Sequence, residues 1–119
     1  MSVTIYHNPR CSTSRKVLEM IRERGETPEV IDYLKAPPSR DDLRRLARDS
    51  GLGLRGLLRQ KGTPYDDLGL ADQGKSDEQL LDAIEAHPIL LNRPVVVTAK
   101  GTRLTRPVEL LDEILPARG

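Results

Sequence analysis

Residues 3–34, VTIYHNPRCSTSRKVLEMIRERGETPEVIDYL, decide the fold class of this chain. Residues 3–7 form an alternating, β-branched run, which is typical of a strand. A helix is predicted over residues 12–24, with Gly25 as its end, and residues 29–34 indicate a second strand. A strand, a helix and a strand within about thirty residues form a βαβ unit, so we expect an α/β fold.

The middle of the chain, about residues 39–87, is predicted to be a helical insertion that carries no strand. Helix-starting residues and apolar residues at helical spacing recur along it. Three helices are predicted there: one that begins at Ser39 with Asp42 and ends near Gly51, a short one over residues 54–60, and one that begins at a capping box of Ser76 and Gln79 and reaches His87.

The sheet resumes after the insertion. Residues 94–98 contain three consecutive valines, which suit a strand buried on both faces, and residues 102–104 indicate a short returning strand. Pro107 is expected to begin a final helix that reaches Leu115. Together with the βαβ unit, these segments predict a small mixed four-stranded sheet within a single domain, residues 1–119.

Composition and charge exclude several classes of protein. The 19 basic and 18 acidic residues give a net charge of +1, which excludes a broad electrostatic attraction to nucleic acid or anionic lipid. The chain has no Phe or Trp for stacking bases, and no apolar run approaches the roughly 20 residues that span a bilayer. The first residues lack a signal peptide, and a single cysteine forms neither an internal disulfide nor a cysteine-rich zinc site. We therefore expect a cytoplasmic protein without a bound metal.

That single cysteine, Cys11, lies at the predicted junction of the first strand and the first helix. The unpaired N–H groups and the dipole at a helix start favour a thiolate, while Arg15 adds positive charge and Ser14 a hydroxyl donor. We interpret Cys11 as a nucleophilic thiol; the alternative is a buried cysteine that packs as a small apolar side chain, which its polar flanks argue against. Because Ser14 stands where a Cys-x-x-Cys dithiol has its second cysteine, the second thiol has to come from glutathione or a partner protein.

Three arginines lie where proline or glycine interrupts the predicted structure. Arg106 is expected at the N-cap of the last helix, before Pro107, where a cation opposes the helix dipole unless an anion binds. Arg93 precedes Pro94 at the start of the valine-rich strand, and Arg59 lies on the short helix of the insertion. All three are candidate anion ligands, and the alternative is that they are solvated surface charges.

A set of short motifs is spread over essentially the whole chain. They are IYHNPRC (residues 5–11), TSR (13–15), YL (33–34), PPSR (37–40), LLR (57–59), LGLA (68–71), HPIL (87–90), NRPVVV (92–97), GTRL (101–104) and RP (106–107). In this combination the sequence resembles the bacterial arsenate reductases that depend on glutathione and glutaredoxin. The resemblance implies a thioredoxin/glutaredoxin-like fold with a helical insertion.

The resemblance also implies a role for each candidate residue. The catalytic cysteine of the family corresponds to Cys11, and its three oxyanion-binding arginines correspond to Arg59, Arg93 and Arg106. The peptide bond before Pro94 is expected to be cis.

Further residues around the cysteine are expected to have accessory roles. The family places a histidine at His7, which suggests that it helps to hold the thiolate; the alternative is a histidine that only caps the end of the strand. Ser14 and Arg15 complete the accessory set. One departure is Ser12, where the best-known members carry glycine, so the backbone beside the nucleophile has less conformational freedom here.

The function implied by the resemblance is arsenate reduction. Cys11 would attack arsenate, and electrons from glutathione and glutaredoxin would reduce it to arsenite, with no tightly bound cofactor and with a monomeric protein. Two alternatives keep the fold and Cys11: a glutathione-dependent thiol/disulfide oxidoreductase, and a thioredoxin-like redox regulator without arsenate activity. The regulators often carry a two-cysteine switch that this chain lacks, and three arginines favour an oxyanion enzyme over both alternatives.

Overall fold

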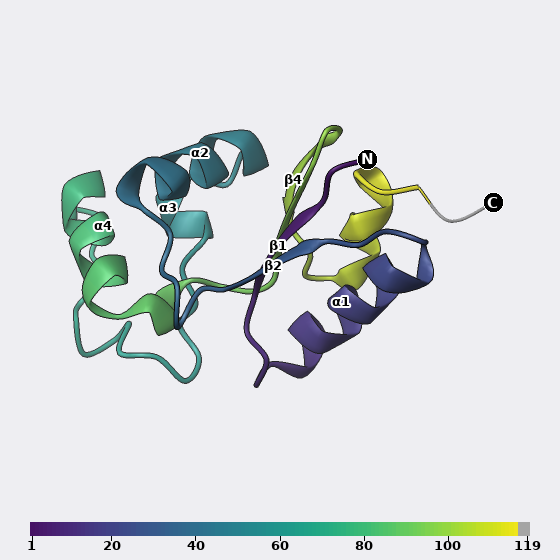
Figure 1. The fold of residues 1–119 in the computed structure, drawn as a ribbon. Coiled ribbons are helices and arrows are strands. Elements are labelled where there is room, and N and C mark those ends of the chain that lie inside the picture. Colours follow the sequence, from purple (N-terminus) through teal and green to yellow (C-terminus); the bar gives the residue numbers. More distant parts are fainter. Residues whose placement is uncertain (117–119) are drawn as a thin grey trace. The chain divides into compact units, whose positions relative to one another are not determined.

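The computed structural model describes residues 1–116, and the chain is arranged in two compact units (Figure 1). The first unit contains Met1–Ala36 together with the chain from Arg93 onward, and the second unit is Pro37–Asn92. The second unit corresponds to the predicted helical insertion, with slightly wider bounds. In residues 1–116, no helix is both long enough and apolar enough to cross a membrane.

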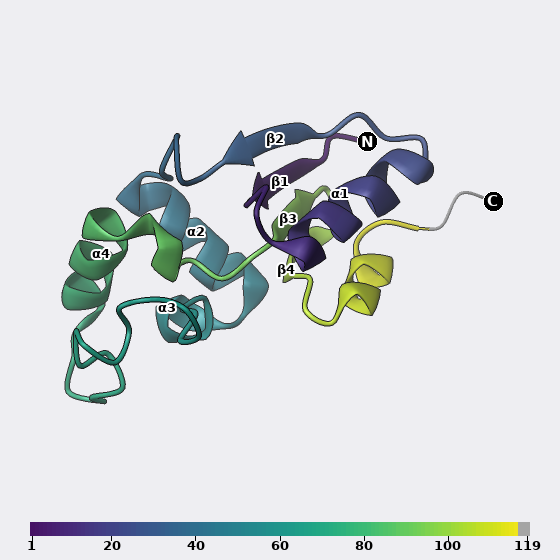
Figure 2. The same ribbon diagram turned by 90° about the horizontal axis from the view of Figure 1, so that it is seen from below.

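The first unit is built on a mixed sheet, as the sequence predicts (Figure 2). The described residues form four strands, β1 (Thr4–His7), β2 (Glu29–Asp32), β3 (Val95–Thr98) and β4 (Gly101–Leu104), in the order β2-β1-β3-β4. β1 is parallel to β2 and antiparallel to β3, and β3 is antiparallel to β4. His7 at the end of β1 pairs with Asp32, and Tyr6 pairs with Val95.

A shared apolar core joins the sheet of the first unit to two helices. The helix α1 (Ser12–Glu23) and the 3-10 helix η2 (Val108–Glu113) pack side by side on one face of the sheet (Figures 1 and 2). The buried side chains of this core are Val3, Ile5, Val17, Leu18, Ile21, Val96, Leu111, Ile114 and Leu115. Each such side chain stabilises the folded chain by roughly 1.5–3 kcal/mol relative to exposure, so α1 is held firmly against β1.

The second unit is helical, with α2 (Arg40–Ser50), α3 (Gly53–Gly56), α4 (Asp77–Ala86) and the 3-10 helix η1 (Pro88–Leu90). The predicted capping boxes are present at both long helices: Ser39 with Asp42 caps α2, and Ser76 with Gln79 caps α4. The α2 helix ends at Gly51, whose φ of 74° lies in the left-handed region that glycine adopts without strain.

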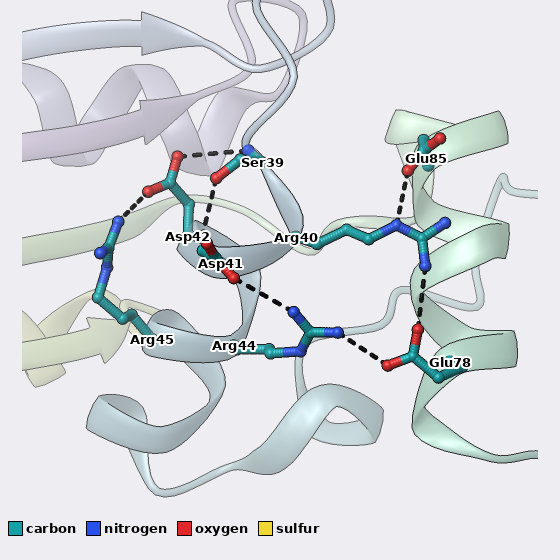
Figure 3. A network of polar contacts seen from close by, with 8 residues as sticks. All are labelled: Ser39, Arg40, Asp41, Asp42, Arg44, Arg45, Glu78 and Glu85. Carbon is teal, nitrogen blue, oxygen red and sulfur yellow. Dashed lines mark hydrogen bonds and ion pairs between the residues drawn. The ribbon is translucent and has the colours of Figure 1, made fainter.

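Charged side chains connect α2 to α4 within the second unit (Figure 3). The Arg40 guanidinium donates to Glu78 at 3.2 Å and to Glu85 at 2.9 Å, and it also pairs with Asp82. Arg44 donates to Glu78 at 2.8 Å. Both arginines pair with carboxylates of α4, and so they connect the two helices rather than serve as candidate anion ligands.

Two predicted elements have different bounds in the structure. The second strand ends at Asp32 rather than at residue 34, because the Asp32 carboxylate accepts the Leu34 N–H and its carbonyl accepts the Lys35 N–H, which turns the chain. The short helix predicted over residues 54–60 is only the four-residue α3.

The chain after α3 forms a bridge to a distant segment instead of a further helical turn. Leu58 forms an isolated antiparallel bridge with Leu91, the Arg59 N–H donates to the Leu90 carbonyl at 2.7 Å, and the Asn92 N–H donates to the Leu57 carbonyl at 2.8 Å. The expectation that residues 39–87 carry no strand is confirmed, because this bridge is isolated and lies outside the strands of the described chain. These contacts, with residues more than thirty positions away in the chain, take the place of a further helical turn.

The last helix also differs from the expectation. It is the 3-10 helix η2 with Pro107 as its N-cap, so Arg106 lies one residue before the N-cap and not at it. The Leu110 N–H donates to the Pro107 carbonyl at 3.1 Å, which is the i to i+3 bond of the tighter helix. The dipole of such a short helix gives no reason for an arginine there, and the role of Arg106 has to come from its contacts.

Candidate active site

The loop between β1 and α1 places Cys11 at the start of the helix. Cys11 is the N-cap residue of α1, with an extended backbone at φ −91° and ψ 121°, and its thiol is half-buried. Its N–H donates to the Asn8 carbonyl at 3.0 Å, and its carbonyl accepts the Arg15 N–H at 3.0 Å. The first turn of α1 contains no acidic residue, so no carboxylate competes with a thiolate for its N–H groups.

The surroundings of Cys11 favour the thiolate. Burial raises the pKa of the thiol, but the backbone N–H groups of Ser14 and Thr13 and the Arg93 guanidinium lower it by more. The pKa of Cys11 is therefore below that of an ordinary cysteine. A larger fraction of Cys11 than of an ordinary cysteine is therefore in the thiolate form at neutral pH, as the position at a helix start predicts.

Arg93 and Arg106 come together on Cys11 although thirteen positions separate them in the chain. They flank the β3–β4 hairpin, in which Val95 pairs with Leu104. The Arg106 Nη1 donates to Cys11 Sγ at 3.8 Å and to the Arg93 carbonyl at 3.2 Å. The structure thus gathers two of the three predicted arginines around the thiol.

Each of the two arginines precedes a proline through a cis peptide bond. The bond between Arg93 and Pro94 is cis, which is the geometry that the resemblance implied. The bond between Arg106 and Pro107 is also cis, and nothing in the sequence analysis anticipated it.

Behind Cys11, His7 and Ser14 form a buried polar pair. Their Nδ1 and Oγ atoms lie 2.6 Å apart and share a hydrogen bond, and the Ser14 side chain is fully buried. Burial lowers the pKa of His7, Asp32 opposes this, and Arg22 and Arg15 add to the lowering. His7 is therefore neutral at pH 7, which makes it a hydrogen-bonding partner of Ser14 rather than a source of positive charge beside the thiolate.

Arg15, the third predicted accessory residue, is bound to the same loop. Its Nη1 donates to the Pro9 carbonyl at 2.9 Å, while its side chain remains exposed. Arg15 therefore fixes the shape of the loop in addition to bringing charge near it.

Arg59 belongs to the second unit, where its guanidinium is held by neighbouring oxygens. Its Nη1 donates to Asn92 Oδ1 at 3.4 Å and its Nε donates to the Lys61 carbonyl at 3.1 Å. Nearby Arg55 instead donates to the carbonyls of Leu70 and Asp72 and has a structural role. That Arg59 shares an oxyanion with Cys11 stays a prediction.

One buried residue of the site escaped the sequence analysis. Asn8, which the sequence presents only as a strand-ending residue before proline, is 1% exposed and bonds to both Cys11 and Ser14. An Asn-Pro pair at a strand end is so common in turns that the pattern alone does not distinguish this residue. In the part of the chain that the structure describes, no group of three His, Cys, Asp or Glu side chains could hold a metal ion.

Residues 6–114 match the sequence profile of the ArsC family. The chain belongs to the ArsC family. Among ArsC relatives, an arsenate reductase of Rhizobium meliloti is 56% identical over 116 residues, which cover 98% of this chain and 83% of the relative. An arsenate reductase of Escherichia coli is 54% identical over 115 residues, covering 97% of this chain and 82% of the relative.

The ArsC fold is also found among solved structures. The structure of an arsenate reductase from Vibrio cholerae superposes with a TM-score of 0.91 at 44% identity, covering 97% of this chain and 98% of that chain. The family resemblance and the α/β, thioredoxin-like fold class predicted from the sequence are thus confirmed.

Proposed function

We propose that this ArsC-family protein is an arsenate reductase in which Cys11 is the nucleophile. The observation that carries the proposal is the contact of the Arg106 guanidinium with the Cys11 thiol, whose pKa is lowered although burial opposes it. A thiolate beside an arginine can attack an anion that the same arginine attracts. The ArsC relatives at 54–56% identity are arsenate reductases by name, which supports this function over the two alternatives.

The arginines would hold arsenate, which is a tetrahedral anion at neutral pH. A guanidinium donates paired, charge-assisted hydrogen bonds to two oxygens, and so orients such an anion better than an ammonium does. Arg93 and Arg106 supply two of these groups. Arg59 would supply the third, an assignment that rests on the membership of the chain in the ArsC family.

In the first step, the Cys11 sulfur forms a bond to arsenic and an oxygen leaves as hydroxide, which a proton from solvent converts to water. The Cys11 thiolate supplies the electron pair of the new bond, and arsenic stays in its five-valent state. The backbone N–H groups of Thr13 and Ser14 stabilise the thiolate before attack, and the arginines balance the negative charge of the adduct.

In the second step, the thiolate of glutathione attacks the Cys11 sulfur and forms a mixed disulfide. The pair of electrons from the broken sulfur–arsenic bond remains on arsenic, which leaves as three-valent arsenite. Glutaredoxin then exchanges thiol for disulfide and releases Cys11 as a thiolate. Because the chain has one cysteine, the oxidised sulfur always pairs with a second molecule.

The reductants place the protein in a compartment rich in reduced glutathione, which is the cytoplasm. The chemistry needs one Cys11 and one set of arginines, all on the same chain, so we assign the active form as a monomer. No tightly bound cofactor is required, since glutathione enters as a second substrate.

The proposal is tested by following NADPH oxidation coupled through glutathione reductase, glutathione and glutaredoxin, with and without arsenate. We expect oxidation that depends on arsenate, and its loss in Cys11→Ser. Arg48→Lys changes an exposed arginine whose partner is its neighbour Asp49, and should behave as the parent does. Oxidation that proceeds with a glutathione mixed disulfide but is unaffected by arsenate would instead identify a thiol/disulfide oxidoreductase.

A further inference from the structure

Asn8 uses every polar group that it has, although the residue is only 1% exposed. Its N–H donates to Ser14 Oγ at 3.1 Å, and its carbonyl accepts the Cys11 N–H at 3.0 Å. Its side-chain Oδ1 accepts the Arg10 N–H at 3.0 Å, and its Nδ2 donates to the Tyr33 hydroxyl at 3.3 Å. The Arg10 bond fixes the orientation of the amide, because a backbone N–H requires the oxygen and not the nitrogen on that side.

These four bonds connect three different parts of the first unit. Two of them close the turn that leads to Cys11, and a third reaches Ser14 within the first turn of α1. The fourth anchors the loop to Tyr33, a fully buried residue that directly follows β2. A change at Tyr33 would therefore reach the loop without touching Cys11 itself.

We propose that Asn8, anchored by Tyr33, is a positioning residue that holds the turn between β1 and α1, and with it the Cys11 thiol at the start of the helix. The polar pair of His7 and Ser14 supports the same turn from the buried side. Asn8 acts through the backbone, since its own side chain bonds to Arg10 and Tyr33. The proposal concerns the reactivity of the Cys11 thiol. Only the expected effect of Asn8 on arsenate turnover rests on the proposed function.

The charged groups that face Cys11 come from other parts of the chain. Arg93 and Arg106 reach it from the two ends of the β3–β4 hairpin, and Arg15 lies on α1 bound to the Pro9 carbonyl. His7 stands behind Ser14, with its pKa lowered by burial. A change at Asn8 or Tyr33 leaves all these charges in the chain, so its effect on the thiol reports the position of the thiol at the start of α1.

The test is the rate of Cys11 alkylation by iodoacetamide as a function of pH, measured on the full chain without arsenate. We expect both Asn8→Ala and Tyr33→Phe to raise the pKa of the thiol. At a pH below that pKa, each unit of increase slows alkylation about tenfold, because only the thiolate reacts. At high pH, where the thiol is ionised in every variant, the rates should converge.

Tyr65→Phe is the matched control, since it removes the same hydroxyl from a tyrosine of the second unit that takes no part in the contacts of Asn8. Its alkylation profile should equal that of the parent. Thermal unfolding of each variant shows whether it is folded. If Asn8→Ala fails to fold, Tyr33→Phe decides, because phenylalanine keeps the buried ring.

A folded Tyr33→Phe variant with the parent's alkylation profile would overturn the proposal. A raised thiol pKa in both variants supports the positioning role. A parallel assay of arsenate turnover then tests the proposed function independently of that role. If the thiol responds as expected while the parent reduces no arsenate, the positioning role stands and the assigned substrate is wrong. If turnover is present, kcat should fall more than KM rises, because the arginines still bind the anion.

Discussion

The Arg106 guanidinium bonds to the Cys11 thiol and to the carbonyl of a second arginine, so its shape should matter as well as its charge. Arg106→Lys keeps the charge but loses the planar fork. A lost charge-assisted hydrogen bond costs about 1.5–3 kcal/mol, which corresponds to a fall of roughly ten- to a hundred-fold in kcat/KM for arsenate. Arg48→Lys is the control, and full activity in Arg106→Lys would remove Arg106 from the site.

His7 gives the stability of the protein a pH dependence whose sign follows from burial. Burial lowers the pKa of His7 in the folded chain, so below the unfolded value of about 6.5 the unfolded chain takes up a proton that the folded chain does not. The contribution of neutral His7 is fully present above that value and is lost as the pH falls through the folded pKa.

We therefore expect His7→Gln to have a smaller loss of unfolding free energy than the parent when the pH is lowered from about 7.5 to 5.5, across the unfolded value. Urea unfolding at several pH values measures this. His87→Gln, at the C-cap of α4, is the comparison variant, because it removes the other histidine and leaves His7 intact. Equal slopes in the parent and in His7→Gln would show that burial of His7 is not the cause.

At the scale of single residues, the sequence predicts the candidate reactive and anion-binding residues better than the buried residues that hold them in place. Cys11 is evident because the junction of a strand and a helix places its sulfur beside unpaired N–H groups, and Arg93 and Arg106 stand out beside prolines. Asn8 is not evident, because its importance depends on Tyr33, twenty-five residues later, and on burial that only the folded chain shows.

The end of α2 illustrates how a single backbone angle stabilises an element. Gly51 adopts a φ of 74°, and a Cβ there would meet no heavy atom within 4 Å, so a substitution is opposed by backbone strain alone. We expect Gly51→Ala to lower the unfolding free energy by about 1–2 kcal/mol. Gly51→Asn should cost less, because asparagine enters the left-handed region more readily than alanine. An alanine variant as stable as the parent in urea would contradict this expectation.

Among the elements, those with local signals were predicted and those set by distant partners were not. The capping boxes at Ser39 and Ser76 act within one turn, so the starts of α2 and α4 were predicted correctly. The chain after α3 is drawn into a bridge with Leu91, and η2 takes a 3-10 form that residue spacing does not distinguish from an α-helix over so short a length. Pairing with a distant segment decided the first of these two cases.

At the scale of the whole molecule, a bound oxyanion should stabilise the folded chain. Arg93 and Arg106 hold two positive charges near one thiol, and an anion between them binds the native state only. Arsenate, phosphate or sulfate at 100 times its dissociation constant should raise the unfolding free energy by about 2.7 kcal/mol. Calorimetry with sodium chloride at matched ionic strength is the control. A melting temperature that follows ionic strength alone would argue against a specific site.

The register of the sheet determines where the chain leaves the first unit and where it returns to it. Asp32 at the end of β2 lies beside His7, and Val95 at the start of β3 lies opposite Tyr6. The chain therefore leaves the sheet and returns to it at the same end of the strands, where β1 leads into Cys11. Within the described chain, no strand pairing of the sheet involves residues 37–92. We therefore expect the sheet to form in a chimaera in which this segment is replaced by that of a relative. Such a chimaera should keep the contacts of Cys11 with Asn8 and Arg106, because all three residues belong to the first unit.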